Sequence, residues 1–175
     1  LRWAAAGGGP GDDQGADFAA ARDGTTWAVG TYFGPASFGA GSVGEGWGNG
    51  KASAVAYARE GAKVVAVDLH EASASATRDI IRGESGDAIS VVADVTQLAD
   101  VQRSVDEARR AYGRIDILHN NVGITSQGGP VETSEETWDR VMAVNVKSMF
   151  LTCKCILPVM EAQGSGAIIN ISSIA

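Results

Sequence analysis

The chain has 175 residues, of which 45% are hydrophobic and 20% are charged, so it holds enough apolar material for one globular domain. Its formal net charge is −7 and no cluster of lysine or arginine stands out, which argues against a nucleic-acid partner. No uninterrupted apolar run approaches the roughly 18 residues that cross a bilayer, and no basic segment precedes an apolar stretch, so we expect neither a membrane span nor a secretory signal.

The first part of the chain differs in composition from the rest. Residues 1 to about 25 are rich in alanine, glycine and aspartate without any sustained period, which predicts a disordered or atypical segment. Residues 26–33 have strand-like composition, although Gly30 interrupts them. A dense glycine loop follows over 38–50, and the regular part of the chain begins only after it.

From Lys51 onward, helical and strand patterns alternate. An alanine-rich segment closed by Gly61 predicts a helix over 51–60. The continuous β-branched run over 63–68 is typical of a buried parallel strand. The same criteria predict further helices over 71–82 and 96–112, and further strands over 88–92 and 115–119.

The last third continues this alternation. Thr133, with Glu136 three residues on, fits a capping box that starts a helix running through Met142. The apolar stripe from Met149 to Met160 marks the next helix, and 167–171 is the last strand. Strands and helices that alternate at this spacing predict βαβ units, and therefore an α/β fold with a parallel sheet covered on both faces.

Two cysteines, Cys153 and Cys155, lie two positions apart inside a helical pattern, so their side chains point in different directions. Neither a histidine nor a further cysteine is close in sequence. We therefore expect no metal site, and a reduced, cytoplasmic protein.

The glycine loop and the next strand end predict a nucleotide site. Gly48, Asn49 and Gly50 directly precede a helix, where a pyrophosphate approaches backbone N–H groups and a Cβ would block it. A flexible linker has similar composition, so the loop alone decides nothing. Asp68 ends the following strand and can accept hydrogen bonds from the adenosine ribose of NAD while repelling the extra phosphate of NADP. A helix-capping aspartate or a methyltransferase site would also suit this pattern.

Four segments resemble motifs of the short-chain dehydrogenase/reductase family, at the family's spacing, and the resemblance covers about residues 38–175. They are Ala93-Asp94-Val95-Thr96, Asn120-Asn121-Val122-Gly123, Met142–Val146 and Ile169–Ser173. The resemblance implies a Rossmann-type, doubly wound parallel sheet that is incomplete at its C-terminal side. It also implies hydride transfer between nicotinamide and a secondary alcohol or ketone, and makes 26–175 a partial NAD(P)-binding domain.

The resemblance also implies roles for individual residues. Ser173 would hydrogen-bond the substrate oxygen, with Ser172 as the competing serine, and Asn145 would hold a water in the proton relay. Asn145 could instead satisfy buried backbone groups. The expected cofactor is NAD, since Asp68 disfavours NADP. The residues expected to bind it are Gly39, Ser42, Gly48, Asn49, Gly50, Asp68, Asp94, Val95, Asn121, Val122 and Gly123.

The remaining expectations concern partners. The family implies a small-molecule alcohol or carbonyl substrate. It also implies a homo-oligomer that pairs through helices including the one over 146–163. His119, directly before the Asn120 motif, is interpreted as structural.

The sequence departs from the family pattern at both ends. Phe38-Gly39 stands where the family has Thr-Gly, and Pro35 argues against a central strand directly before it. Either 26–33 supplies that strand or the reading frame before about Ser37 is not the ancestral one. No tyrosine of this chain has lysine four positions later, whereas the family's acid/base is a Tyr-x-x-x-Lys pair. We therefore expect impaired activity from this chain alone, with a non-catalytic NAD-binding fragment or an incomplete gene product as alternatives.

Overall fold

The computed structural model describes residues 25–29 and 48–172. Gly39, Ser42, Ser173 and all but the end of the segment 1–25 lie outside the described residues. Statements about structure below refer to the described ranges.

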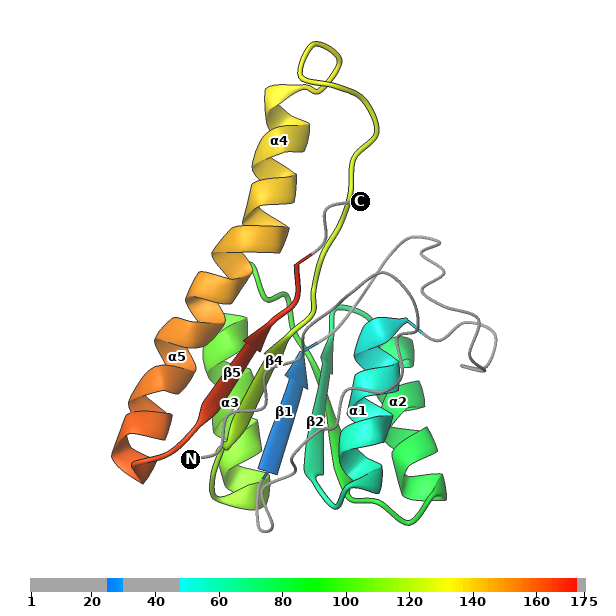
Figure 1. The fold of residues 1–175 in the computed structure, drawn as a ribbon, viewed down its shortest axis with the longest axis vertical. Coiled ribbons are helices and arrows are strands. Elements are labelled where there is room, and N and C mark those ends of the chain that lie inside the picture. Colours follow the sequence, from blue (N-terminus) through cyan, green and yellow to red (C-terminus); the bar gives the residue numbers. More distant parts are fainter. Residues whose placement is uncertain (1–24, 30–47, 173–175) are drawn as a thin grey trace, which may run out of the picture.

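Five parallel strands form one sheet in the order β3-β2-β1-β4-β5 (Figure 1). This order confirms the expected doubly wound Rossmann-type sheet, and the doubtful early strand becomes its central member. Strand β1 pairs with β2 on one side and with β4 on the other, so the order in which strands are added to the sheet reverses at β1. The strands are β1 (Thr25–Val29), β2 (Lys63–Asp68), β3 (Ala88–Val92), β4 (Ile117–Asn120) and β5 (Ala167–Asn170).

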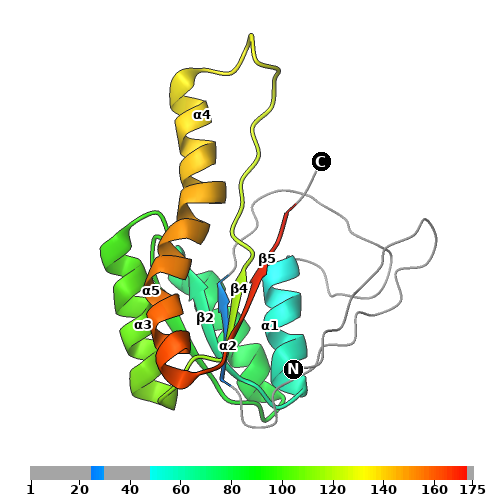
Figure 2. The same ribbon diagram turned by 60° about the vertical axis from the view of Figure 1, so that its left-hand side comes forward.

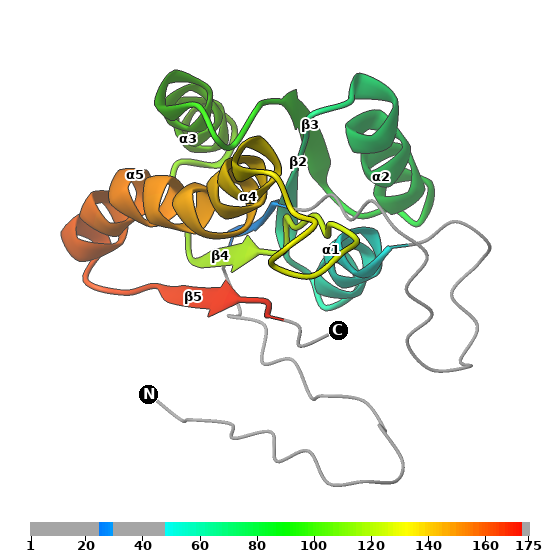
Figure 3. The same ribbon diagram turned by 90° about the horizontal axis from the view of Figure 1, so that it is seen from above.

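Helices cover both faces of the sheet (Figure 3). On one face lie α1 (Asn49–Arg59) and α2 (Glu71–Gly83), and on the other lie α3 (Leu98–Tyr112) and α5 (Ser148–Gln163). Strand β2 is apolar from Val64 to Val67, and its packing explains why. Val64 packs with Val55 and Ile81 on the first face, whereas Val65 and Val67 pack with residues of α3 and α5 on the second. A strand buried on both faces has no polar side.

A single helix of 29 residues spans Glu135–Gln163, where two separate helices were expected. Its first part is α4 (Glu135–Met142), and a π-helical turn, η1 (Ala143–Lys147), joins it to α5. The α4 end extends past the carboxyl ends of the strands (Figure 2). The capping prediction was wrong by one residue. Ser134 Oγ accepts the Thr137 N–H at 3.1 Å, whereas Thr133 Oγ donates to the Gly129 carbonyl and closes the preceding turn.

By length and composition this long helix is apolar enough to cross a membrane, as core helices of globular proteins also are, so the expectation of no membrane span stays a prediction. Leu151, Ile156 and Met160 of α5 are buried in the core beside β4, as in core helices of this length. About 22% of the most apolar 18-residue stretch of this helix is buried within this chain.

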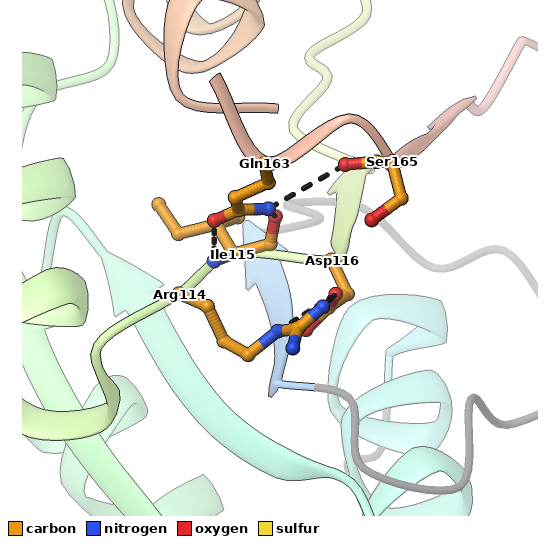
Figure 4. Close-up of polar contacts among 5 residues, drawn as sticks. All are labelled: Arg114, Ile115, Asp116, Gln163 and Ser165. Carbon is orange, nitrogen blue, oxygen red and sulfur yellow. Dashed lines mark hydrogen bonds and ion pairs between the residues drawn. The ribbon is translucent and has the colours of Figure 1, made fainter. Parts of the chain in front are cut away.

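The side chain of Gln163 holds the backbone that leads into β4 (Figure 4). At the end of α5, Gln163 Oε1 accepts the Ile115 N–H at 3.0 Å, and its Nε2 donates to the Ile115 carbonyl at 2.8 Å. The adjacent Arg114 guanidinium contacts both carboxylate oxygens of Asp116 at 2.6–3.0 Å. Ile115 and Asp116 have no regular secondary structure, with the Ile115 backbone bonded to Gln163, and β4 begins at Ile117, two residues later than predicted.

Candidate cofactor site

The first turn of α1 offers backbone donors. Gly48 precedes the helix with extended backbone, its carbonyl accepts the Ala52 N–H at 3.1 Å, and no side chain caps the helix. Gly50 is buried and, with Lys51 and Asp68, lines a small hollow between α1 and the end of β2. Uncapped N–H groups at a helix N-terminus attract a phosphate through both hydrogen bonding and the helix dipole.

Asp68, the last residue of β2, is buried and accepts the His70 N–H on Oδ1 at 2.8 Å. Burial raises the pKa of the Asp68 carboxyl, while the His70 N–H and the charges of His70 and Lys51 oppose that rise. A carboxylate at this edge, short of water, is suited to accept hydrogen bonds from ligand hydroxyls.

A pocket of about 370 Å³ opens beside Asp68 at the carboxyl ends of β2 and β3, a size that small-molecule sites commonly have. The structure brings four predicted residues together here, namely Asp68, Asp94, Val95 and Val122. The other lining residues were not assigned to the site from the sequence, and they come from β2, from the segments after β2, β3 and β4, and from α4 and the π-helical turn. The complete lining is Val67, Asp68, Leu69, His70, Ala93, Asp94, Val95, Thr96, Val122, Ile124, Arg140 and Val144.

Asp94 shapes the floor of this pocket through a tight turn. Its Oδ1 accepts the Thr96 N–H at 2.9 Å and the Thr96 hydroxyl at 2.7 Å, while its own N–H donates to Asp100 Oδ2 at 2.9 Å. The Asp94 N–H, followed by Arg103, lowers the pKa of Asp100. Because Thr96 belongs to this turn, α3 begins at Leu98 rather than at Thr96 as predicted.

Asn145 lies in the π-helical turn, and both polar atoms of its side-chain amide bond to the backbone of Ile124. Oδ1 accepts the Ile124 N–H at 2.8 Å, and Nδ2 donates to the Ile124 carbonyl at 2.8 Å. The backbone-satisfying interpretation of Asn145 therefore describes what its side chain does here, and its catalytic role stays a prediction. A π-helical turn is frequent at functional sites.

Three further predicted residues are sequence neighbours of pocket-lining residues without lining the pocket themselves. They are Asn121, Gly123 and Asn145. Asn121 is buried. A Cβ on Gly123 would meet Asn145 Oδ1 at 3.7 Å, an ordinary van der Waals contact. The protein therefore leaves room for a side chain at Gly123, so a need for glycine there would come from a ligand.

Asn120 was not assigned a role, yet it joins three elements. Its Nδ2 donates to Asn170 Oδ1 at 2.8 Å, its Oδ1 accepts the Thr152 hydroxyl at 2.9 Å, and its carbonyl accepts the Ile171 N–H at 2.9 Å. This network ties the ends of β4 and β5 to α5, directly before Ser172. The only sequence signal for it was the pair of consecutive asparagines.

His119 is buried against α1, in keeping with its structural interpretation. The Tyr57 hydroxyl and His119 Nδ1 are 2.7 Å apart, and the two rings meet edge to face at 5.6 Å. Burial lowers the pKa of His119, which the Asn121 side chain partly opposes, and burial raises the pKa of Tyr57 to about 12. Both groups are thus held neutral at pH 7 inside the fold.

The comparisons with known proteins agree with this geometry. The sequence model of the family described as short chain dehydrogenase matches residues 42–175. The chain belongs to the short-chain dehydrogenase/reductase family. That membership confirms the resemblance and removes the methyltransferase alternative.

Among the curated relatives of this short-chain dehydrogenase/reductase chain is an uncharacterized oxidoreductase of Thermotoga maritima. It is 42% identical over 133 residues, which cover 76% of this chain and 52% of the relative. A 2,5-dichloro-2,5-cyclohexadiene-1,4-diol dehydrogenase of Sphingobium indicum is 41% identical over 127 residues, which cover 73% of this chain and 51% of that protein. The chain therefore spans about half the length of the curated relatives it matches.

Solved structures give the same picture. A protein of Burkholderia xenovorans, described as a short-chain dehydrogenase/reductase, is 44% identical with a TM-score of 0.75, covering 86% of this chain and 56% of that one. A 3-ketoacyl-ACP reductase of Sinorhizobium meliloti is 28% identical with a TM-score of 0.74, covering 86% of this chain and 54% of that one.

Proposed function

We propose that this chain carries the nucleotide-binding part of an NAD(H)-dependent oxidoreductase that interconverts a secondary alcohol and a ketone. The observation that carries the proposal is the pocket at the carboxyl ends of β2 and β3, where a buried Asp68 faces Asp94 and apolar walls. In open α/β sheets, ligands bind in the crevice outside the carboxyl ends of the strands, next to the point where strand order reverses.

The residues of this edge fit a dinucleotide. In the proposal, Gly48, Asn49 and Gly50 bind the pyrophosphate through uncapped N–H groups, and Gly39 and Ser42 extend that loop. Asp68 accepts hydrogen bonds from the adenosine ribose, and its charge disfavours the 2′-phosphate of NADP. The cofactor, when bound, supplies or accepts the hydride. The residues proposed to border the adenine and its ribose are Asp94, Val95, Asn121, Val122 and Gly123.

The proposed catalytic residues are Ser173 and Asn145. Ser173 donates a hydrogen bond to the substrate oxygen, where negative charge develops during hydride transfer. Asn145, whose amide bonds to the Ile124 backbone from the π-helical turn, orders a water for the proton relay in this proposal. The substrate is a small alcohol or carbonyl compound, and residues 26–175 form the partial NAD(P)-binding domain.

We further propose that the complete protein is a cytoplasmic homo-oligomer. Large apolar side chains recur every four or seven positions along the exposed side of the long helix, and such a patch usually marks an interface. They are Trp138, Met142, Val146, Phe150 and Leu157, with exposed fractions from 39% to 61%.

Titration of the purified chain with NADH, followed by fluorescence and thermal melting, tests the proposed function. We expect saturable binding and a higher melting temperature. At 100 times Kd, a ligand specific for the folded state adds about 2.7 kcal/mol to the free energy of unfolding. NADPH is expected to bind more weakly, and S-adenosylmethionine serves as a control that should not bind. A cooperative melt that NADH does not shift would contradict the proposal, and the absence of both a cooperative melt and NADH binding would contradict it for this chain.

A further inference from the structure

Arg140 is the one lining residue of the 370 Å³ pocket with a permanent positive charge. It reaches the pocket from α4, whereas Asp68 lines it from β2 and Asp94 from the turn after β3. Its side chain is exposed, and it forms none of the ion pairs found among the described residues. The guanidinium is therefore not committed to a carboxylate of the described chain.

Val144 follows Arg140 by four positions along the same helix and lines the same pocket. Residues four apart in a helix are neighbours on one face. Val144 is half-buried and Arg140 is exposed, so the apolar side chain covers the inner part of the pocket and the guanidinium covers its mouth. Most of the remaining wall is apolar, from Val67, Ala93, Val95, Val122 and Ile124.

An apolar pocket with a planar cation at its mouth suits a flat, electron-rich ring. A guanidinium stacks on aromatic faces and is less strongly hydrated than an ammonium. We propose that Arg140 is a specificity-determining residue that stacks over the adenine ring of the bound nucleotide, closing the pocket above it. The inference rests on the proposed function, because it takes its ligand from that proposal.

Replacement of Arg140 tests the stacking. Arg140→Met keeps the length of the side chain and removes its charge and its plane, and Arg140→Lys keeps the charge alone. Arg110→Met is a matched control, because Arg110 lies on α3 and does not line the pocket. The probes are NADH, AMP and reduced nicotinamide mononucleotide, measured by isothermal titration calorimetry. The melting temperature of each unliganded variant checks folding.

Arg140→Met is expected to weaken both NADH and AMP about 5-fold, and to leave reduced nicotinamide mononucleotide unchanged. Arg140→Lys should fall between wild type and Arg140→Met, and Arg110→Met should match wild type. If wild type binds NADH and Arg140→Met binds it equally well, the stacking role is wrong while the proposed function stands. A larger loss for NADPH than for NADH would mean that Arg140 serves a phosphate, which also overturns it. If wild type binds neither NADH nor AMP, the proposed function fails and the role of Arg140 with it.

Discussion

At the carboxyl end of β4, the Asn145 amide exchanges two hydrogen bonds with the backbone of Ile124, both at 2.8 Å. At the amino end, the Gln163 amide does the same with Ile115, at 3.0 and 2.8 Å. Both amides belong to the one helix that spans Glu135–Gln163. The difference lies in what surrounds them, because Ile124 lines the pocket and Ile115 is a core residue with no exposed surface.

The carboxylates of the two edges differ in the same way. Asp116, at the amino edge, is held by the Arg114 guanidinium on both oxygens. Asp68, at the carboxyl edge, is equally buried, and its hydrogen bonds come from backbone N–H groups, those of His70 and Leu69. The Asp116 carboxylate is thus neutralised by a cation of the protein, whereas the Asp68 carboxylate is bonded by neutral donors and can accept a further hydrogen bond from a ligand. Matched substitutions at the two edges test this contrast.

The largest expected effect is on NADH affinity, from the two carboxylates. Asp68→Asn keeps an acceptor for the His70 N–H but loses its charge, and hydrogen bonds to charged groups contribute about 1.5–3 kcal/mol. We expect NADH to bind about 10- to 150-fold more weakly to Asp68→Asn. Asp116→Asn should leave NADH affinity unchanged and lower the free energy of unfolding by about 1.5–3 kcal/mol, because the buried carboxylate loses its charged bonds to Arg114. Calorimetric titration and denaturant unfolding measure the two quantities.

The pH dependence of Asp68 has a definite sign. Its pKa in the folded protein lies above the ordinary value of 3.8, because burial disfavours the charged form. The charged carboxylate therefore costs stability above the folded pKa, and this cost is relieved as the pH falls through that pKa. NADH affinity should decline over the same fall, because ribose hydroxyls bind the charged form. Both pH effects should be missing in Asp68→Asn, and equal pH profiles for the two proteins would contradict this account.

The amide pair is expected to show a smaller effect on binding. Asn145→Ala and Gln163→Ala each leave a backbone N–H and carbonyl unpaired, which costs about 1–3 kcal/mol of unfolding free energy. Asn145→Ala should also weaken NADH several-fold, because Ile124 lines the pocket. Gln163→Ala should bind NADH like wild type at a temperature where both are folded. An equal loss of affinity in both variants would show that the two edges are coupled rather than distinct.

The smallest effect on stability is expected at Gly123, and Gly166 provides the contrast. A Cβ on Gly166, before β5, would lie 2.4 Å from Met160 Cγ and Sδ and 2.8 Å from its Cβ. Because Met160 is buried in the core, Gly166→Ala should cost about 1–3 kcal/mol. Gly123→Ala has room, and its stability should change by less than about 0.5 kcal/mol. If a nucleotide passes close to Gly123, the same variant should lose affinity for NADH. Thermal melting with and without NADH gives both results, and a variant at Gly123 that melts early without ligand would refute the interpretation.

The sequence predicted the regular elements well where local pattern decides them. The bounds of β2 and β3 agree with the predicted ranges, and in β2 the apolar run ends abruptly at Asp68. The start of β4 was misplaced, since the backbone of the strand-like Ile115 bonds to the side chain of Gln163, which lies 48 positions further on. The single long helix was missed because a π-helical turn breaks the periodicity that a helical stripe is recognised by.

The candidate site was predictable where a motif placed a residue at a strand end. Asp68, Asp94, Val95 and Val122 line one pocket as expected from such positions. Arg140 was not predicted, because only the packing of the long helix against the sheet brings that side chain to the pocket. The network around Asn120 likewise depends on Thr152 and Asn170, whose proximity no local pattern contains.

The central position of β1 also determines when the sheet can be completed during synthesis. Val29 pairs with Val67 on one side and with Asn120 on the other, a partner that follows it by ninety-one positions. During synthesis, the strand destined for the middle of the sheet thus waits with one edge open until β4 has left the ribosome. Contacts so distant in sequence form slowly, and unpaired edges invite association in the meantime. Nascent chains that stop before Asn120 are therefore the ones most in need of a chaperone.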